Sequence, residues 1–396
     1  MSEAAVRHRS FFFFWACAIA LGLVFPVMTH AQDRWWPTEV NVYDPACTSG
    51  DPECWNDPQN QPEHLSSIDY VPLDPSQVKN KHHICVSFPH LKDSYWVGVA
   101  YGIIEEGKRL GQKITLVEAG GYTKLERQLS QVDDCISNGA EGQSIGSGSA
   151  IGNAKQRDLL RESGVPVVDV INGINTAVDA KSLQSFYNMG FISCQWVVDQ
   201  AQGQAAVRIA WFPGPPGAGW SVAADKGCVD AVADSNIEIV FTRWGDTGKS
   251  VQLKLVEDVL TSSLTGDNVD LDYIIGTATT AEAAAGAIRA LGLRGKIDIV
   301  AFYYTPGIHA FLKRGEVAMA PTDQMIVQAR IAVDQMVRLL EGIKMSSGGR
   351  AEFGNSGRLA EHVQPPPIVV TPDTVDAFDT STTLAPRGWR PLFSVD

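Results

Sequence analysis

The chain has 396 residues, a formal net charge of −13 and 44% hydrophobic residues. So acidic a chain argues against nucleic acid as a partner, because phosphate binding requires clustered Lys and Arg side chains. The length and the hydrophobic content are sufficient for two buried cores, so we expect more than one compact unit.

The first 31 residues are typical of a secretory signal peptide. A basic start at Arg7 and Arg9 precedes an apolar run over 11–24, and Thr-His-Ala at 29–31 is typical of a cleavage site. A permanent transmembrane helix is the alternative, but Pro26 leaves the apolar run short for a full span. We therefore predict cleavage after Ala31 and a periplasmic protein.

Six cysteines remain once Cys17 is removed with the signal peptide, and an even number favours disulfides in an exported protein. Two candidate pairs are Cys47 with Cys54, which would close a local loop, and Cys85 with Cys135, which would join a strand to a later helix. Cys194 and Cys228 are left open between a disulfide and two buried free thiols.

Residues 32–80 are rich in Pro, Asp, Asn and Trp and show no sustained periodicity. Their seven prolines exclude a long helix and central strands, which predicts an irregular arm. Trp35, Trp36 and Trp55 are expected to dock this arm onto the body of the protein. The alternative is that they contact a partner.

Strand-like and helix-like segments alternate from Lys81 onwards. The expected strands are 83–88, 113–118, 141–148, 165–170, 207–212, 237–241, 273–276 and 297–302. The expected helices are 94–110, 125–138, 153–163, 195–206, 219–235, 249–261, 280–291 and 324–340. This order predicts an α/β protein with two doubly wound parallel-sheet lobes, 81–190 with 323–346 and 191–322 with 364–396. A ligand cleft between the lobes and hinge closure are expected.

Enzyme motifs are incomplete. Gly245-Asp-Thr-Gly-Lys-Ser250 resembles a phosphate loop, but Arg243 stands where that loop needs its first glycine. Gly142-Gln-Ser144-Ile-Gly146 matches a nucleophile elbow, yet its glycines occupy the expected strand itself, and His309 or His362 would have to serve as the base. No Cys or His cluster has zinc spacing. We therefore predict no catalytic residue, no metal and no cofactor, with a serine hydrolase as the least favoured alternative.

Aromatic side chains follow several expected strands at their carboxyl ends, where ligands bind in open α/β sheets. The set comprises Tyr95, Trp96, Tyr122, Trp220, Trp244, Tyr303 and Tyr304. Their π faces suit a methylated amine through cation–π attraction. A sugar ring is the alternative, with Asp93, Asp199 and Asp323 to bind its hydroxyls. For Trp96 alone, packing in the core under the sheet is an equal alternative.

Three motifs resemble the TorT family. They are Pro-His-Leu-Lys-Asp-Ser-Tyr-Trp at 89–96, Leu-Val-Glu-Ala-Gly-Gly-Tyr at 116–122 and Thr-Asp-Gln-Met at 322–325. Members of that family are exported type I periplasmic binding proteins that recognise trimethylamine N-oxide and partner the sensor histidine kinase TorS. The resemblance implies two lobes joined by three hinge crossovers, near Ser193, Thr322 and the stretch before Pro365.

The resemblance also implies an aromatic cage and the Cys85–Cys135 bridge. By motif, the implied ligand-binding residues are Asp93, Tyr95, Trp96, Tyr122 and Tyr303, and Asp323 is a further candidate. The family's cage tryptophan falls at Ser193 in an ungapped match, and Trp196 replaces it only if the loop has shifted by three residues. Trp220 stands where the family has a glycine.

The resulting expectation is a periplasmic sensor, not an enzyme, that binds trimethylamine N-oxide or a related methylated amine and signals to a TorS-like kinase. The alternative is the substrate-binding protein of an ABC importer for a sugar or another small solute, because a fold does not fix a function.

Overall fold

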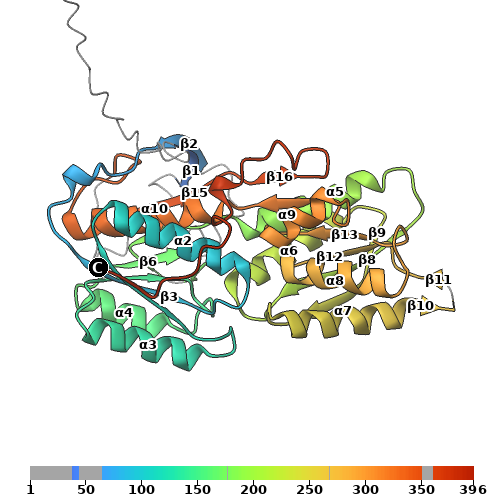
Figure 1. Cartoon of the computed structure of the whole chain (residues 1–396), viewed down its shortest axis with the longest axis horizontal. Helices are drawn as coiled ribbons and strands as arrows, with labels where there is room; N and C mark the ends of the chain where they lie inside the picture. Colours follow the sequence, from blue (N-terminus) through green and yellow to red (C-terminus); the bar gives the residue numbers. More distant parts are fainter. Residues whose placement is uncertain (1–37, 44–64, 176, 267, 350–359) are drawn as a thin grey trace, which may run out of the picture. The chain divides into compact units, whose positions relative to one another are not determined.

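The computed structural model describes residues 38–43, 65–175, 177–266, 268–349 and 360–396. These residues form two α/β lobes, each with a central sheet covered by helices on both faces (Figure 1). The expected doubly wound architecture is therefore confirmed.

The sheet of the first lobe has the strand order β17-β4-β3-β5-β6-β7-β15-β1-β2. Its middle strands, from β4 to β15, are parallel, and antiparallel strands flank them on both sides. The bounds are β1 Thr38–Tyr43, β2 Leu65–Tyr70, β3 His83–Phe88, β4 Lys113–Glu118, β5 Gly142–Ile145, β6 Val167–Val170, β7 Ala180–Ser182, β15 Glu361–Gln364 and β17 Ser394–Val395.

Helices α2 (Ser94–Arg109) and α10 (Met325–Glu341) cover one face of this sheet, and α3 (Leu125–Ser137) and α4 (Ala154–Glu162) cover the other (Figure 1). Helix α10 is buried along nearly its whole length. Inside it, Arg330 Nη2 lies 2.7 Å from the Glu106 carboxylate of α2. This ion pair satisfies two charges that would otherwise be costly to bury.

The sheet of the second lobe is parallel and has the order β13-β12-β8-β9. Its strands are β8 Val207–Gly214, β9 Ile237–Trp244, β12 Tyr273–Gly276 and β13 Asp298–Ala301. Helices α5 (Phe186–Gln200) and α6 (Gly219–Val232) lie on one face, with α7 (Lys249–Ser263) and α8 (Ala278–Ala290) on the other (Figure 1). Helix α9 is Pro306–Lys313. Short strand pairs are β10 Leu264–Thr265 with β11 Asn268–Val269, and β14 Ala320–Thr322 with β16 Ile368–Val370.

Helix α5 begins nine residues earlier than the sequence predicted, at Phe186 rather than 195. The Ser185 side chain caps it by accepting a hydrogen bond from the backbone of Asn188. Gly190 lies inside this helix and permits close packing, because a Cβ atom at this position would lie 2.1 Å from the Ala224 carbonyl oxygen of α6.

The chain leaves the first sheet after Ser182 and enters α5, so the first crossover precedes Ser193, which lies inside α5. Hydrogen bonds tie the three crossovers together. Gln184 Nε2 donates to the Pro365 carbonyl at 2.6 Å, and Gln324 Nε2 donates to the Pro366 carbonyl at 2.7 Å. These contacts link the three crossovers to one another.

Two expectations about the ends of the chain are wrong. Within 32–80, the described residues 38–43 and 65–70 are not irregular, because β1 and β2 pair with each other and β1 pairs with β15. Prolines flank these two strands but do not interrupt them, and Val40 and Val42 alternate into the core. The tail 364–396 stays with the second lobe only in part, because β16 pairs with β14 whereas β17 pairs with β4 of the first sheet. Trp35, Trp36, Trp55, Cys47 and Cys54 lie outside the described residues.

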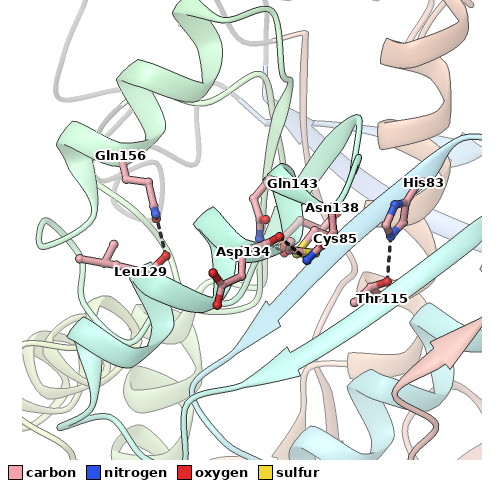
Figure 2. The surroundings of a disulfide bond; sticks show 10 residues. His83, Cys85, Thr115, Leu129, Asp134, Asn138, Gln143 and Gln156 are labelled. Carbon is pink, nitrogen blue, oxygen red and sulfur yellow. Dashed lines mark hydrogen bonds between the residues drawn. A yellow bond between two sulfur atoms is a disulfide. The ribbon is translucent and has the colours of Figure 1, made fainter.

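Two disulfides join elements within the lobes. Cys85 of β3 is bonded to Cys135 of α3, across one strand–helix–strand unit (Figure 2). Cys194 of α5 is bonded to Cys228 of α6, which resolves the alternative that the sequence left open. Within the described ranges, no helix is long and apolar enough to cross a lipid bilayer.

Candidate functional site

An aromatic cavity lies where the loops of the two lobes meet. Its volume is about 10 Å³, which is room for about one water molecule, against about 730 Å³ for a groove formed by α2, α9 and the C-terminal tail. The lining residues are Asp93, Tyr95, Trp96, Tyr122, Ile171, Asn172, Phe186, Trp220, Thr247 and Tyr303. Both lobes contribute, so the cavity depends on their approach.

The N-terminus of α2 supplies one wall. The carboxylate of Asp93 caps the helix by accepting backbone N–H bonds from Tyr95 and Trp96 at 3.1 and 3.2 Å. The cap fixes the first turn, which points both aromatic side chains inward. Trp96 is only 2% exposed, and its ring packs against Phe88 of β3 at a centroid distance of 4.7 Å. It therefore belongs to the core and to the cavity wall at once.

Tyr122, from the loop after β4, faces Trp220 in the first turn of α6. The indole Nε1 of Trp220 donates to the Tyr122 hydroxyl at 3.0 Å. Asn172 Nδ2 donates to the same hydroxyl at 3.5 Å and to the Ser147 carbonyl at 2.6 Å. A hydrogen bond between the lobes therefore closes this side of the cavity.

Tyr303, which follows β13, closes the other side. Its ring lies 5.2 Å from that of Tyr95 in a T-shaped contact, and 6.1 Å from that of Trp220. The Tyr95 hydroxyl donates to the buried carboxylate of Asp323. Burial, and then the nearby Asp323 charge, raise the pKa of Tyr95 well above its ordinary value, so this hydroxyl stays protonated.

Asp93 is the one carboxyl group among the residues that line the cavity. Burial raises its pKa, while His90 beside it acts in the opposite direction. Burial also lowers the pKa of His90, whose Nε2 lies 3.0 Å from Thr247 Oγ1 of the second lobe. A neutral His90 donates its Nε2 proton to the Thr247 hydroxyl. The proton of that hydroxyl is then available for the Asp93 carboxylate, with which the Thr247 side chain forms a hydrogen bond.

The cavity contains five of the seven ligand-binding residues expected from the sequence: Asp93, Tyr95, Trp96, Tyr122 and Tyr303. Asp323 lies behind Tyr95 and does not line it. Trp196 is half-buried on α5 and does not line it either. Ten residues of α5 separate Trp196 from Phe186, about 15 Å along the helix axis, so only Phe186 reaches the cavity.

Neither Ser193 nor Trp196, the two positions considered for the family's cage tryptophan, lines the cavity. The Ser193 hydroxyl is buried and donates to the Met189 carbonyl at 2.8 Å. Phe186 and Trp220 line the cavity instead, with ring centroids 5.6 Å apart. Trp220 was visible in the sequence as a strand-end aromatic, but Phe186 was missed because it follows no expected strand and precedes the expected start of its helix at 195.

The serine of the nucleophile-elbow motif lies in the sheet of the first lobe. Ser144 is buried inside β5, and its Oγ has no hydrogen-bond partner among the described atoms. The described residues also contain no cluster of three His, Cys, Asp or Glu that could hold a metal ion.

Comparison with known proteins agrees with this architecture. The family described as a periplasmic binding protein domain matches residues 84–344. The periplasmic protein TorT of Escherichia coli strain K12 is 31% identical over 344 residues, which are 86% of this chain and 90% of that protein. The chain belongs to the TorT family of periplasmic binding proteins.

Solved structures extend the likeness to TorT. The TorS sensor domain–TorT complex, solved without ligand and with trimethylamine N-oxide, contains a chain that is 28% identical at a TM-score of 0.66, with 79% of this chain and 100% of that chain covered. An ABC transporter solute-binding protein from Bradyrhizobium sp. BTAi1 with bound bis-tris is 42% identical at a TM-score of 0.69, over 91% of this chain and 98% of that chain.

The TorT family consists of periplasmic binding and sensor proteins, not enzymes. Its members reside in the periplasm, as their names state.

Proposed function

We propose that this protein is a periplasmic sensor whose aromatic cavity binds trimethylamine N-oxide or a related methylated amine, and whose closure is read by a TorS-like histidine kinase. Six aromatic side chains around one carboxylate suit methyl groups on a positively charged nitrogen, since each ring presents a negative π face. The ligand and the kinase of the TorT relatives support the same choice.

The single observation that carries the proposal is the ring arrangement around Trp220. Tyr122, Phe186 and Tyr303 surround it at centroid distances of 5.6 to 6.1 Å. A sugar site needs several side chains that can bind hydroxyl groups. Here the lining offers one carboxylate, one amide and one threonine beside the phenols, which favours an amine over a sugar.

Calorimetric titration of the exported protein with trimethylamine N-oxide tests the proposal, and we expect saturable heat at one site. Tyr303→Leu removes a cavity ring and should abolish this heat. Tyr304→Leu is the matched control, because Tyr304 is equally buried but packs against Phe378 outside the cavity. If the wild-type protein gives neither heat nor a thermal shift, the ligand assignment is wrong.

The proposal includes export with cleavage after Ala31, and no catalysis. Mass spectrometry of protein recovered from the periplasm should give a chain that starts at Gln32. An intact start at Met1 would contradict cleavage. An esterase assay with Ser144→Ala as control should detect no activity that depends on this serine.

A role in ABC import is the second candidate, because the relative at 42% identity is called an ABC transporter solute-binding protein. The two functions differ in their partner. We expect the purified protein to bind the sensor domain of a TorS-like kinase in a ligand-dependent way. Uptake of labelled ligand that depends on this protein and on a permease, without kinase binding, would favour import.

A further inference from the structure

We propose that Trp220 is a positioning residue for the Tyr122 hydroxyl, which it turns into a hydrogen-bond donor toward an oxygen atom of the ligand. This inference rests on the proposed function, because it concerns how the same cavity selects an N-oxide over a methylated amine that lacks oxygen.

The turn before α6 is built to admit the Trp220 ring. A Cβ atom at Gly214, whose φ is +114°, would lie 2.5 Å from Cη2 of that ring. A Cβ atom at Gly219 would lie 2.6 Å from the Gly173 carbonyl oxygen of the first lobe. Glycine at both positions therefore lets the ring and the helix start approach the opposite lobe.

Packing then holds the indole in one orientation. Trp220 is 4% exposed, and its ring lies 5.6 Å from Phe186 and 5.9 Å from Phe302. With the ring fixed, its Nε1–H points at the Tyr122 hydroxyl, 3.0 Å away. Little side-chain freedom remains that would let the donor turn elsewhere.

N–H donors occupy the accepting side of this hydroxyl. Trp220 donates at 3.0 Å and Asn172 at 3.5 Å, and the Trp96 side chain forms a further hydrogen bond to Tyr122. A phenol has one proton to donate, and burial raises the Tyr122 pKa so that the proton is retained. In the part of the chain that the structure describes, no protein acceptor takes this proton, so it is left for the ligand.

The consequence is a preference for an N-oxide over a methylated amine without oxygen, which aromatic rings alone cannot provide. Cation–π attraction acts on the methyl groups of trimethylamine N-oxide and of tetramethylammonium alike. Only the N-oxide oxygen can accept from Tyr122. The indole N–H of Trp220, which holds the phenol in the donating orientation, therefore determines selectivity for the oxygen-bearing ligand.

The test measures the dissociation constants of both probes for the wild-type protein and for Trp220→Phe, which keeps a ring but removes the N–H group. We expect the affinity ratio that favours trimethylamine N-oxide to fall about tenfold, the usual effect of one buried hydrogen bond. Trp211→Phe is the matched control, because Trp211 donates to Asp225 in the same lobe at 2.9 Å and does not line the cavity. The affinity ratio of the Trp211→Phe variant should equal that of the wild-type protein.

A double-mutant cycle completes the test. Tyr122→Phe should lower the ratio by at least as much, and Trp220→Phe should add nothing to it, because the indole acts through the hydroxyl. If Trp220→Phe weakens both probes equally, or changes neither, Trp220 is only a wall and the inference is wrong. A wild-type protein that binds tetramethylammonium equally well also overturns it. If the wild-type protein binds neither probe, the proposed function itself fails.

Discussion

The hydroxyl of Tyr95 donates a hydrogen bond to Oδ2 of Asp323, which joins the first turn of α2 to the segment between β14 and α10. Gln328 Nε2 donates to the same oxygen at 3.0 Å, whereas Oδ1 is buried with no partner among the described atoms. Burial raises the pKa of Asp323 to about 6. Tyr95, which lines the cavity, is thus held by a carboxyl group whose ionisation is unfavourable in the folded protein.

Asp323→Asn should remove a pH dependence from stability. The pKa of the Asp323 carboxyl is about 6 in the folded protein, against an ordinary pKa of 3.8. Ionisation of this group therefore lowers the unfolding free energy fully above pH 6 and not at all below pH 3.8. As the pH falls from 7 to 4, the wild-type protein should gain about 2 kcal/mol of unfolding free energy relative to the variant. Urea unfolding across this range measures it. Parallel pH profiles for the two proteins would refute the assignment.

Trp96→Ala should impair both folding and binding. The side chain is 2% exposed and fills space beside Gly146, where a Cβ atom would lie 2.5 Å from the indole. Truncation should therefore cost about 3–5 kcal/mol of unfolding free energy in addition to ligand binding. Trp96→Phe keeps part of the ring and should lose clearly less stability. A normal unfolding midpoint for Trp96→Ala would show that the indole is not part of the core.

Replacing Cys194 and Cys228 together by Ala should destabilise the second lobe. Their bond closes a loop with a sequence separation of 34, and loop-closure entropy predicts a loss of about 3–4 kcal/mol. The result should appear as a lower urea midpoint, and wild-type protein treated with reductant should have a midpoint that is lower still, because it also loses the Cys85–Cys135 bond. Unchanged midpoints would mean that helix packing alone holds α5 on α6.

Gly190→Ala should separate α5 from α6, because the added Cβ atom would meet the Ala224 carbonyl at 2.1 Å. Backbone cannot yield as a flexible side chain does, so we expect a loss of at least about 2 kcal/mol. Gly286→Ala in α8 is the matched control, since no atom lies within 4 Å of its Cβ position. That variant should be neutral or slightly stabilised, because alanine favours the helix. Equal thermal midpoints for the two variants would argue against the tight crossing.

Local sequence patterns predicted much of this protein. Strands β3 and β4 have the predicted bounds, and α2 ends within one residue of its prediction. Alternation of such segments implied two doubly wound lobes. The Asp93 cap and the strand-end positions of Tyr122 and Tyr303 are also local features, and five of the seven predicted cage residues line the cavity.

Tertiary packing decided the rest, because it depends on contacts between residues far apart in the sequence. Phe186 reaches the cavity only because α5 starts early and crosses α6 closely at Gly190. Trp220 becomes a wall only because the lobes approach near Gly219. The carboxyl end of the chain could not be assigned from its own sequence, since β17 is short and its pairing with β4 depends on an edge that the folded first lobe supplies.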